Sequence, residues 1–248
     1  MRKYSYEIQS SWGRCPEKPA EIGTKFLQTI DALSRIDPMF SGWGVQIKPD
    51  SLEGQPIENV RADFTRFVEA NVWRDDLDRP TPHEGYKLLA ATNFHTEDPS
   101  KSLALSVRAG SVYGNKNSLQ AGSGSSPPDS KLITYPVFKA ALLTMLSSWP
   151  ASWANVRVSL WGHRPEGPPG EPPFPYSGYQ MPWMAYLCAE RAAHISLPPG
   201  IPSERTPDGG LLMIAAKTRF DPSDREHMAR SRVLAEILIK HGGDPDAL

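Results

Sequence analysis

The chain has 248 residues and a formal net charge of −1, with 39% hydrophobic and 22% charged residues. This length can bury a sizeable core in one or two domains, and the composition is that of an ordinary globular protein. The near-zero net charge and the lack of basic blocks argue against direct binding of nucleic acid through a broad electrostatic footprint. We expect no membrane span, because no stretch approaches 18 consecutive apolar residues. We also expect a cytoplasmic location, because the N-terminus lacks an apolar run of signal-peptide length.

The first half of the chain alternates between the two apolar periods of regular structure. Period-two alternation predicts strands, and apolar residues every three to four positions predict helices. In chain order these are a strand at 4–9, a helix at 21–36, a strand at 42–47, a helix at 57–73, and strands at 86–93 and 103–108. The Gly-, Ser- and Pro-rich residues 115–129 are predicted to form a flexible loop.

The second half is predicted by the same patterns. Its elements are a helix at 135–149, a strand at 156–161, a proline-rich loop at 163–175, a helix at 179–194, a strand at 211–216 and a final helix that ends at Gly242-Gly243. Asp221 is predicted to cap the final helix, with Pro222 at its first position, where the missing N–H has no cost.

Part of the last segment occurs twice in the chain. Leu88-Leu89 followed by Asp98-Pro99-Ser100 matches Leu211-Leu212 followed by Asp221-Pro222-Ser223 at a constant offset of 123 residues. This predicts two pseudo-repeats of helix, strand, helix and strand, at about 1–114 and 130–248, within a single domain over 1–248.

The element order favours an α+β fold with a mixed β-sheet flanked by helices. A wholly parallel, Rossmann-like sheet is the alternative. It is disfavoured because no GxGxxG motif opens any predicted helix.

No arrangement of reactive side chains indicates catalysis. No two of the six histidines lie three or four residues apart, and neither CxxC nor HExxH occurs, so we predict no metal ligands, no catalytic residues and no cofactor. Cys188 lies in an apolar helical pattern, which does not favour a reactive thiolate. These absences favour a binding protein. A hydrolase that uses a carboxylate or Cys188 stays open as an alternative, as does a structural adaptor of a secretion system.

Two features of the sequence favour a protein partner. The chain has seven tryptophans, a residue type enriched at interface hot spots. Residues 58–84 carry seven carboxylates against four arginines, so an acidic loop beside a tryptophan can steer a basic partner. The predicted partner-binding residues are Trp73, Asp75, Asp76, Asp78 and Glu84.

Three groups of residues, taken in order, resemble the immunity protein 52 family of bacterial polymorphic-toxin systems. They are Asp37-Pro38 with Phe40 and Gly42-Trp43; residues 176–186 with Trp183; and Gly209-Gly210-Leu211-Leu212 followed by Arg219-Phe220-Asp221-Pro222 and His227. From their places in the predicted strand core, turn and helix cap these positions look structural, and the family has no catalytic residues to carry over.

The resemblance implies an antitoxin that binds a cognate secreted toxin inside the cell. The expected toxin is a restriction-endonuclease-like nuclease, often delivered by type VI secretion. Inhibition is expected through occlusion of its active site, or through a block on its assembly or substrate access. A nuclease tends to be basic where it binds phosphates, so the carboxylates of Asp75, Asp76 and Asp78 are expected to compete there.

Overall fold

The structure is a computed structural model that describes residues 4–47, 54–93, 102–113, 117–122, 132–160 and 180–241. Its strands are β1 (Tyr4–Trp12), β2 (Gly44–Gln46), β3 (Gly54–Pro56), β4 (Tyr86–Ala91), β5 (Ala104–Ala109), β6 (Asn117–Gly122), β7 (Trp153–Leu160), β8 (Gln180–Leu187), β9 (Ser203–Arg205) and β10 (Leu211–Ile214). Its α-helices are α1 (Pro19–Leu33), α2 (Phe64–Ala70), α3 (Tyr135–Ser148), α4 (Ala189–Ala192) and α5 (Arg225–Lys240). Short 3-10 helices lie at Pro38–Phe40, Ile57–Asn59, Arg61–Asp63 and Pro82–Glu84.

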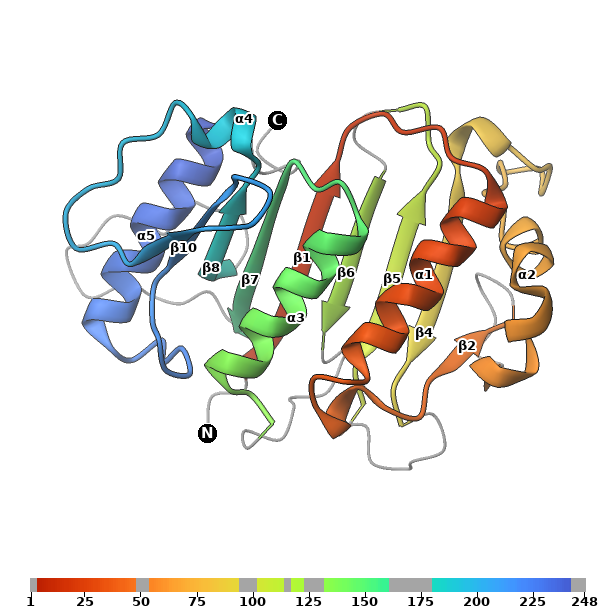
Figure 1. The fold of residues 1–248 in the computed structure, drawn as a ribbon, viewed down its shortest axis with the longest axis horizontal. Coiled ribbons are helices and arrows are strands. Elements are labelled where there is room, and N and C mark those ends of the chain that lie inside the picture. The colour runs from red at the N-terminus through yellow and green to blue at the C-terminus, as the bar shows by residue number, and fades with distance from the viewer. Residues whose placement is uncertain are drawn as a thin grey trace.

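One ten-stranded sheet organises the described residues, in the order β3-β2-β4-β5-β6-β1-β7-β8-β10-β9 (Figure 1). All the strand pairings in the described ranges are antiparallel. The α+β class is therefore confirmed, but parallel pairs, which a mixed sheet requires, are not found there. The Rossmann-like alternative is wrong for the same reason.

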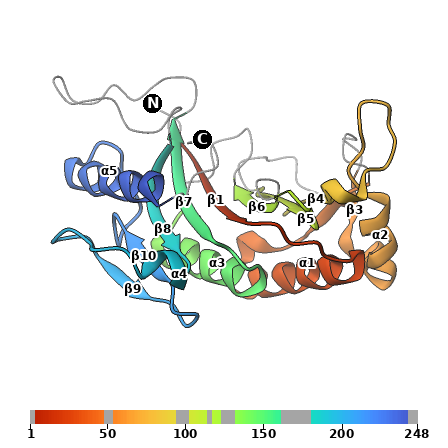
Figure 2. The ribbon, with the colours of Figure 1, turned by 90° about the horizontal axis from the view of Figure 1, so that it is seen from above.

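Helices cover the sheet on two faces. α1 and α3 lie side by side over one face, with α2 beside α1, whereas α5 packs against β8 on the opposite face (Figures 1 and 2). The apolar stripe of α1, formed by Ile22, Phe26, Ile30 and Leu33, is fully buried against this core. The helical period in the sequence therefore places α1 correctly.

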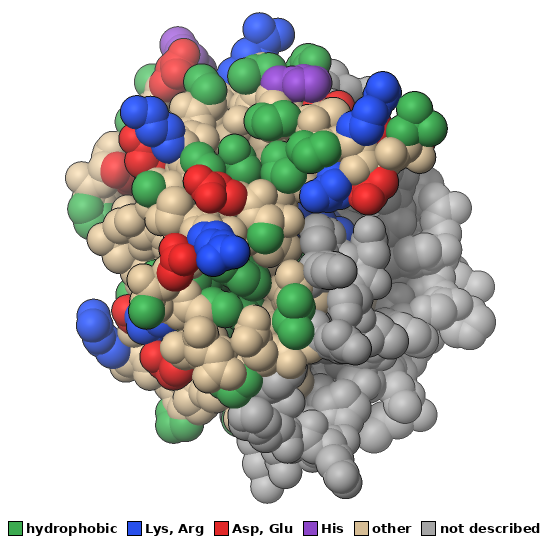
Figure 3. Space-filling model, turned by 90° about the vertical axis from the view of Figure 1, so that its right-hand side faces the viewer, with side chains coloured by type: hydrophobic (Ala, Val, Ile, Leu, Met, Phe, Trp, Pro, Cys, Tyr) green, Lys and Arg blue, Asp and Glu red, His purple; other side chains and the backbone are tan. Residues whose placement is uncertain are grey.

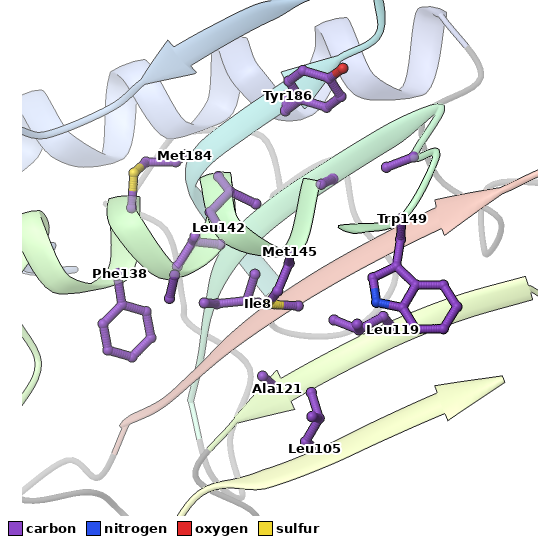
Figure 4. Close-up of a cluster of buried hydrophobic side chains, with 14 of the residues drawn as sticks. Ile8, Leu105, Leu119, Ala121, Phe138, Leu142, Met145, Trp149, Met184 and Tyr186 are labelled. Carbon is purple, nitrogen blue, oxygen red and sulfur yellow. The ribbon is translucent and has the colours of Figure 1, made fainter. Parts of the chain in front are cut away.

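The core between α3 and the sheet is built from alternate strand residues. Figure 4 shows Ile8, Leu119 and Ala121 of neighbouring strands below Phe138, Leu142 and Met145 of α3. At the end of α3, the ring of Trp149 stacks on Trp12 with centroids 5.2 Å apart. Its Nε1 donates to Thr29 Oγ1 of α1 at 3.0 Å, so a single indole connects β1, α1 and α3.

The strand alternation also decides the character of the opposite face. Between the buried residues of β1, β4, β5, β6 and β7 lie polar ones, namely Glu7, Gln9, Lys87, Ser106, Arg108, Ser118, Gln120, Asn155 and Arg157. Glu7 lies directly opposite Arg157 in the β1–β7 ladder, and Arg157 Nε donates to its carboxylate at 2.6 Å. This half of the sheet is therefore apolar under α1 and α3 and polar on the other side.

The prediction that 115–129 is a flexible loop is wrong for residues 117–122, and the rest of that range lies outside the described residues. Asn117–Gly122 forms β6, which pairs with β5 on one side and β1 on the other. Gly, Ser and Asn weaken an isolated strand, but neighbours on both sides satisfy its backbone, and Leu119 and Ala121 are buried. Tertiary pairing therefore overrides the local composition.

Replacing Asn117 with alanine is expected to lower the free energy of unfolding by about 2 kcal/mol or more. Its buried amide accepts from Ser111 N at 2.9 Å and donates to Gly13 O at 2.8 Å and to Ser111 O at 3.0 Å, so the variant leaves buried backbone groups unpaired. Equilibrium urea denaturation measures the loss. Ser118→Ala on the polar face is the control, and equal midpoints for the two variants contradict the structural role of Asn117.

The predicted helix at 179–194 is also wrong. Gln180–Leu187 forms β8, a strand in the interior of the sheet, and only Ala189–Ala192 is helical. Pro182 is accommodated because the β7–β8 register shifts there, at a β-bulge between Val156 and Arg157. The segment is apolar on both faces because α3 and α5 cover both, and such a run carries no period that separates a strand from a helix.

Two helix starts differ from the sequence expectation. Only Phe64–Ala70 of the predicted helix at 57–73 is α-helical, because Ile57 N donates to Trp43 O at 3.1 Å and holds the start of the segment to the sheet edge. The last helix begins at Arg225, and its cap is Asp224, whose carboxylate accepts from Glu226 N and His227 N. Asp221 instead accepts from Ser223 N at 2.8 Å and forms the preceding turn.

The pseudo-repeat stays a prediction. Asp98-Pro99-Ser100 lies outside the described residues, as do the whole loop at 163–175 and the end of the chain after His241. In the described part of the second half, the strand β8 occupies most of the range predicted as the second helix of the repeat, and it pairs with β7.

Candidate functional site

The predicted partner-binding residues lie on one β-hairpin, residues 73–84, which we call the Trp73 hairpin. Trp73 N donates to Gly85 O at 2.9 Å, and Thr81 N donates to Trp73 O at 2.7 Å. Isolated bridges join Val72 to Tyr86 and Arg74 to Pro80. Figure 2 shows the hairpin as the golden loop that projects from the sheet beside β3 and α2.

The turn of the hairpin is organised by Asp75. One oxygen of its carboxylate accepts from Leu77 N and Arg79 N, both at 2.9 Å, and the other accepts from Arg79 Nε at 2.8 Å. Asp78 has a φ of 59°, the left-handed conformation that aspartate tolerates better than most residues. The hydrogen bonds from the Arg79 side chain, then from the Arg79 and Leu77 amides, lower the pKa of Asp75 from its ordinary value. Asp75 is therefore ionised at neutral pH and used to shape the turn.

The three aspartates among the four predicted carboxylates are not equivalent. Asp75 is bound by Arg79, and Asp78 lies 3.6 Å from Arg74 Nη1, although its side chain is 87% exposed. Asp76 is exposed and forms no ion pair with any residue that the structure describes. Asp76 is thus the carboxylate of the hairpin with its full charge available to a partner.

The base of the hairpin contacts the polar face of the sheet. The guanidinium of Arg108 in β5 lies over the ring of Trp73, 4.4 Å from its centroid, in a cation–π arrangement. Trp73, Glu84, Tyr86 and Arg108 line a small surface hollow. The structure therefore brings Trp73 and Glu84 together, and it adds Arg108 and Tyr86, which the sequence reasoning did not select. Side chains alternate between the two faces along β5, so Arg108 lies on the face opposite to the buried Val107. This alternation was the feature of the sequence that could have indicated Arg108.

Gly85 closes the hairpin against β5. Its φ is +88°, and a Cβ atom at this position would lie 2.4 Å from Ala109 O and 2.9 Å from Ser111 N. Only glycine combines this conformation with such a close approach of two backbones. The position of the hairpin relative to the sheet therefore depends on this residue.

Exposed apolar side chains occur at the hairpin and at the segment bonded to it. Leu77 at the tip is 70% exposed, and Val112 and Tyr113 are 38% and 43% exposed. Val112 N donates to His83 O at 3.0 Å, and the His83 and Tyr113 rings meet edge to face at 5.9 Å. Apolar residues beside charged ones are typical of a protein-binding surface.

The surface around α2 carries mixed charge. Figure 3 shows acidic and basic side chains interspersed on this end of the molecule. Arg61 pairs with Asp31 at 2.9 Å and with Glu58 at 3.0 Å, and Arg74 and Arg79 pair within the hairpin. The acidity that the sequence predicts for 58–84 is thus partly neutralised, and Asp76 at the hairpin tip is one of the carboxylates that have no ion pair in the described residues.

The other reactive residues have structural surroundings. Cys188 is the half-buried N-cap residue of α4. His227 stacks on Phe220, and its Nδ1 accepts from Asp221 N at 3.1 Å. Within the described ranges, no group of three or more His, Cys, Asp or Glu residues could hold a metal ion. Nor does any helix in these ranges have both the length and the apolar character needed to cross a bilayer.

The described residues define an α+β protein built on one antiparallel sheet, with a projecting hairpin as its candidate binding surface. The chain belongs to the immunity protein 52 family, whose family model matches residues 4–243. Membership in an immunity protein family implies a cognate toxin as the partner.

The fold is similar to that of the T6SS protein PA0821 of Pseudomonas aeruginosa, with a TM-score of 0.55 and 11% sequence identity, over 96% of this chain and 76% of that chain. At this identity the likeness concerns the fold alone. The search of curated proteins found no match.

Proposed function

We propose that this chain is an antitoxin that binds a cognate secreted nuclease in the cytoplasm and neutralises it by steric and electrostatic occlusion, without catalysing a reaction. The family match over residues 4–243 carries the proposal. The fold similarity to a T6SS protein favours a toxin delivered by type VI secretion. A restriction-endonuclease-like toxin is the target that the family resemblance implies. The acidic hairpin suits such a target, because a nuclease gathers basic residues where it binds phosphates.

The Trp73 hairpin, with Trp73, Asp75, Asp76, Asp78 and Glu84, is the proposed toxin-binding face. It projects from the sheet, its turn is held by the Asp75 hydrogen bonds, and it presents the unpaired carboxylate of Asp76. A surface that is already ordered before association loses less conformational freedom on binding. A hairpin of this kind can therefore cover a basic cleft and exclude its substrate.

Co-expression with the candidate toxin encoded by a neighbouring gene tests the proposal. We expect this chain to restore growth, to co-purify with the toxin and to block cleavage of plasmid DNA by the purified toxin. Rescue of cells from a toxin that does not cut DNA contradicts the nuclease assignment and leaves the antitoxin role. Failure to bind or to rescue contradicts the antitoxin role itself.

Replacing Asp76 with lysine is expected to slow association with the toxin roughly 10-fold at low salt, because it reverses the unpaired charge at the hairpin tip. The difference should nearly vanish at about 0.5 M salt, where exposed charges are screened. Stopped-flow or surface-plasmon-resonance measurements give the association rate constant. Glu190→Lys, an equal charge change on the exposed surface of α4, is the matched control. Equal rates for the two variants remove electrostatic steering by the hairpin from the mechanism.

A further inference from the structure

Leu77 is the most exposed large hydrophobic side chain of the described residues, at 70%. Its backbone is well ordered, because Leu77 N donates to Asp75 Oδ1 at 2.9 Å and Asp78 N donates to Asp75 O at 2.9 Å. Two aspartates flank it, and one of them, Asp76, has no ion pair in the described part of the chain. The fold thus holds an aliphatic side chain in solvent at the end of a shaped turn.

The other candidate contact groups of the hairpin already have partners within the chain. The ring of Trp73 is covered by the Arg108 guanidinium at 4.4 Å, and the Asp75 carboxylate is used by the turn itself. Asp78 lies near Arg74, which also donates to Asp78 O at 2.7 Å. The groups that a partner can engage without breaking an internal contact are therefore Leu77 and Asp76.

We propose that Leu77 is the anchor residue of the toxin interface, and that it enters an apolar pocket of the toxin whose rim is basic. This inference rests on the proposed function. The basic rim follows from Asp76, which enters the interface beside Leu77 and requires an opposite charge there. Asp75 is a positioning residue, because its carboxylate sets the turn that presents Leu77.

Because Leu77 supplies packing and Asp76 supplies charge, changes at these two residues are expected to have different kinetic effects. Removal of the Leu77 side chain deletes short-range packing, which lowers affinity through the dissociation rate and is insensitive to salt. A change at Asp76 acts on long-range attraction, which alters the association rate and is screened by salt.

The test measures binding of the purified, catalytically inactivated toxin from the adjacent gene to this chain and its variants by surface plasmon resonance. Leu77→Ala is expected to raise Kd roughly 30-fold, mostly through faster dissociation and equally at low and high salt. Ile239→Ala is the matched control, because Ile239 is an exposed aliphatic residue, 37% exposed, on α5 at the opposite end of the sheet (Figure 1). Absence of binding by the wild-type chain rejects the proposed function together with this inference. Wild-type binding with a Leu77→Ala Kd within about twofold of the control rejects this inference alone.

The positioning role of Asp75 has a readout that needs no toxin. Asp75→Ala is expected to increase hydrogen exchange at the Leu77 and Arg79 amides of the free protein, since both donate to the Asp75 carboxylate. The same variant is expected to weaken toxin binding roughly 10-fold while the melting temperature changes little. Faster exchange with unchanged affinity shows that the interface does not require the preformed turn, and it overturns this role.

Discussion

Replacing Trp183 with alanine is expected to lower the free energy of unfolding by about 3–5 kcal/mol, the usual cost of deleting a fully buried indole. Trp183 is 0% exposed, and its ring lies 5.7 Å from that of Phe138 in α3 and 6.0 Å from that of Tyr6 in β1. Its Nε1 donates to Ala216 O at 2.9 Å, so the variant also leaves a buried carbonyl without its partner. The chain is expected to lose most of its stability at this single position.

Equilibrium denaturation in urea measures the effect as a lower midpoint with a nearly constant slope. Trp183→Phe is the matched variant. It keeps an aromatic ring in the cluster but removes the indole N–H, and it should cost clearly less than alanine. If alanine and phenylalanine lower the midpoint equally, the hydrogen bond to Ala216 carries the effect and the packing argument is wrong.

Replacing Gly85 with alanine is expected to cost on the order of 3 kcal/mol and to displace the Trp73 hairpin. The backbone conformation at Gly85, with φ 88° and ψ −157°, is accessible almost only to glycine. The added Cβ would also lie 2.4 Å from Ala109 O, a backbone atom of β5 that cannot move aside as a side chain would. Toxin binding should therefore fall in parallel with stability.

Gly13→Ala is the control for the loss of glycine as such, because no atom lies within 4 Å of a Cβ built there and its φ is not positive. Thermal unfolding and toxin binding are measured for both variants. A Gly85→Ala protein that binds the toxin as tightly as wild type contradicts the proposal that the hairpin is the binding face. The Trp183→Ala protein separates the two effects, since it changes the core and leaves the hairpin contacts intact.

The sequence reasoning succeeded where apolar residues have a clear period. The buried stripe of α1 and the alternation in β4, β5 and the first part of β1 follow directly from the spacing of apolar residues, because one face of each is buried and the other is more accessible to solvent. The end of β1, from Ile8 to Trp12, is buried continuously. It failed at β6 and β8. Burial alternates along β6, but its Asn, Ser and Gly residues give it a loop-like composition. β8 is apolar on both faces, so it carries no period that separates a strand from a helix.

The sequence predicts the candidate site as one local segment, and its role in binding stays a prediction. Its residues lie on one short segment, so Trp73, Asp75, Asp76 and Asp78 were bound to be neighbours whatever the fold. The distinct roles of the three aspartates could not be predicted, because they depend on which carboxylate accepts the backbone amides of the turn. Arg108 was missed because it is distant in sequence and reaches Trp73 only through the pairing of β4 with β5.

By itself the sequence indicated the family, the α+β class and the acidic loop beside Trp73, because these depend on local residue order and on periodic burial. The hairpin conformation of that loop came from the structure. The tertiary structure decided the antiparallel arrangement of the sheet, the strand conformation of Gln180–Leu187 and the charge that the hairpin leaves unpaired. Each of these results from contacts between residues far apart in the chain. Folding decides whether a strand is buried on both faces, because the covering helices come from distant parts of the chain. Folding also decides which arginine pairs with which carboxylate.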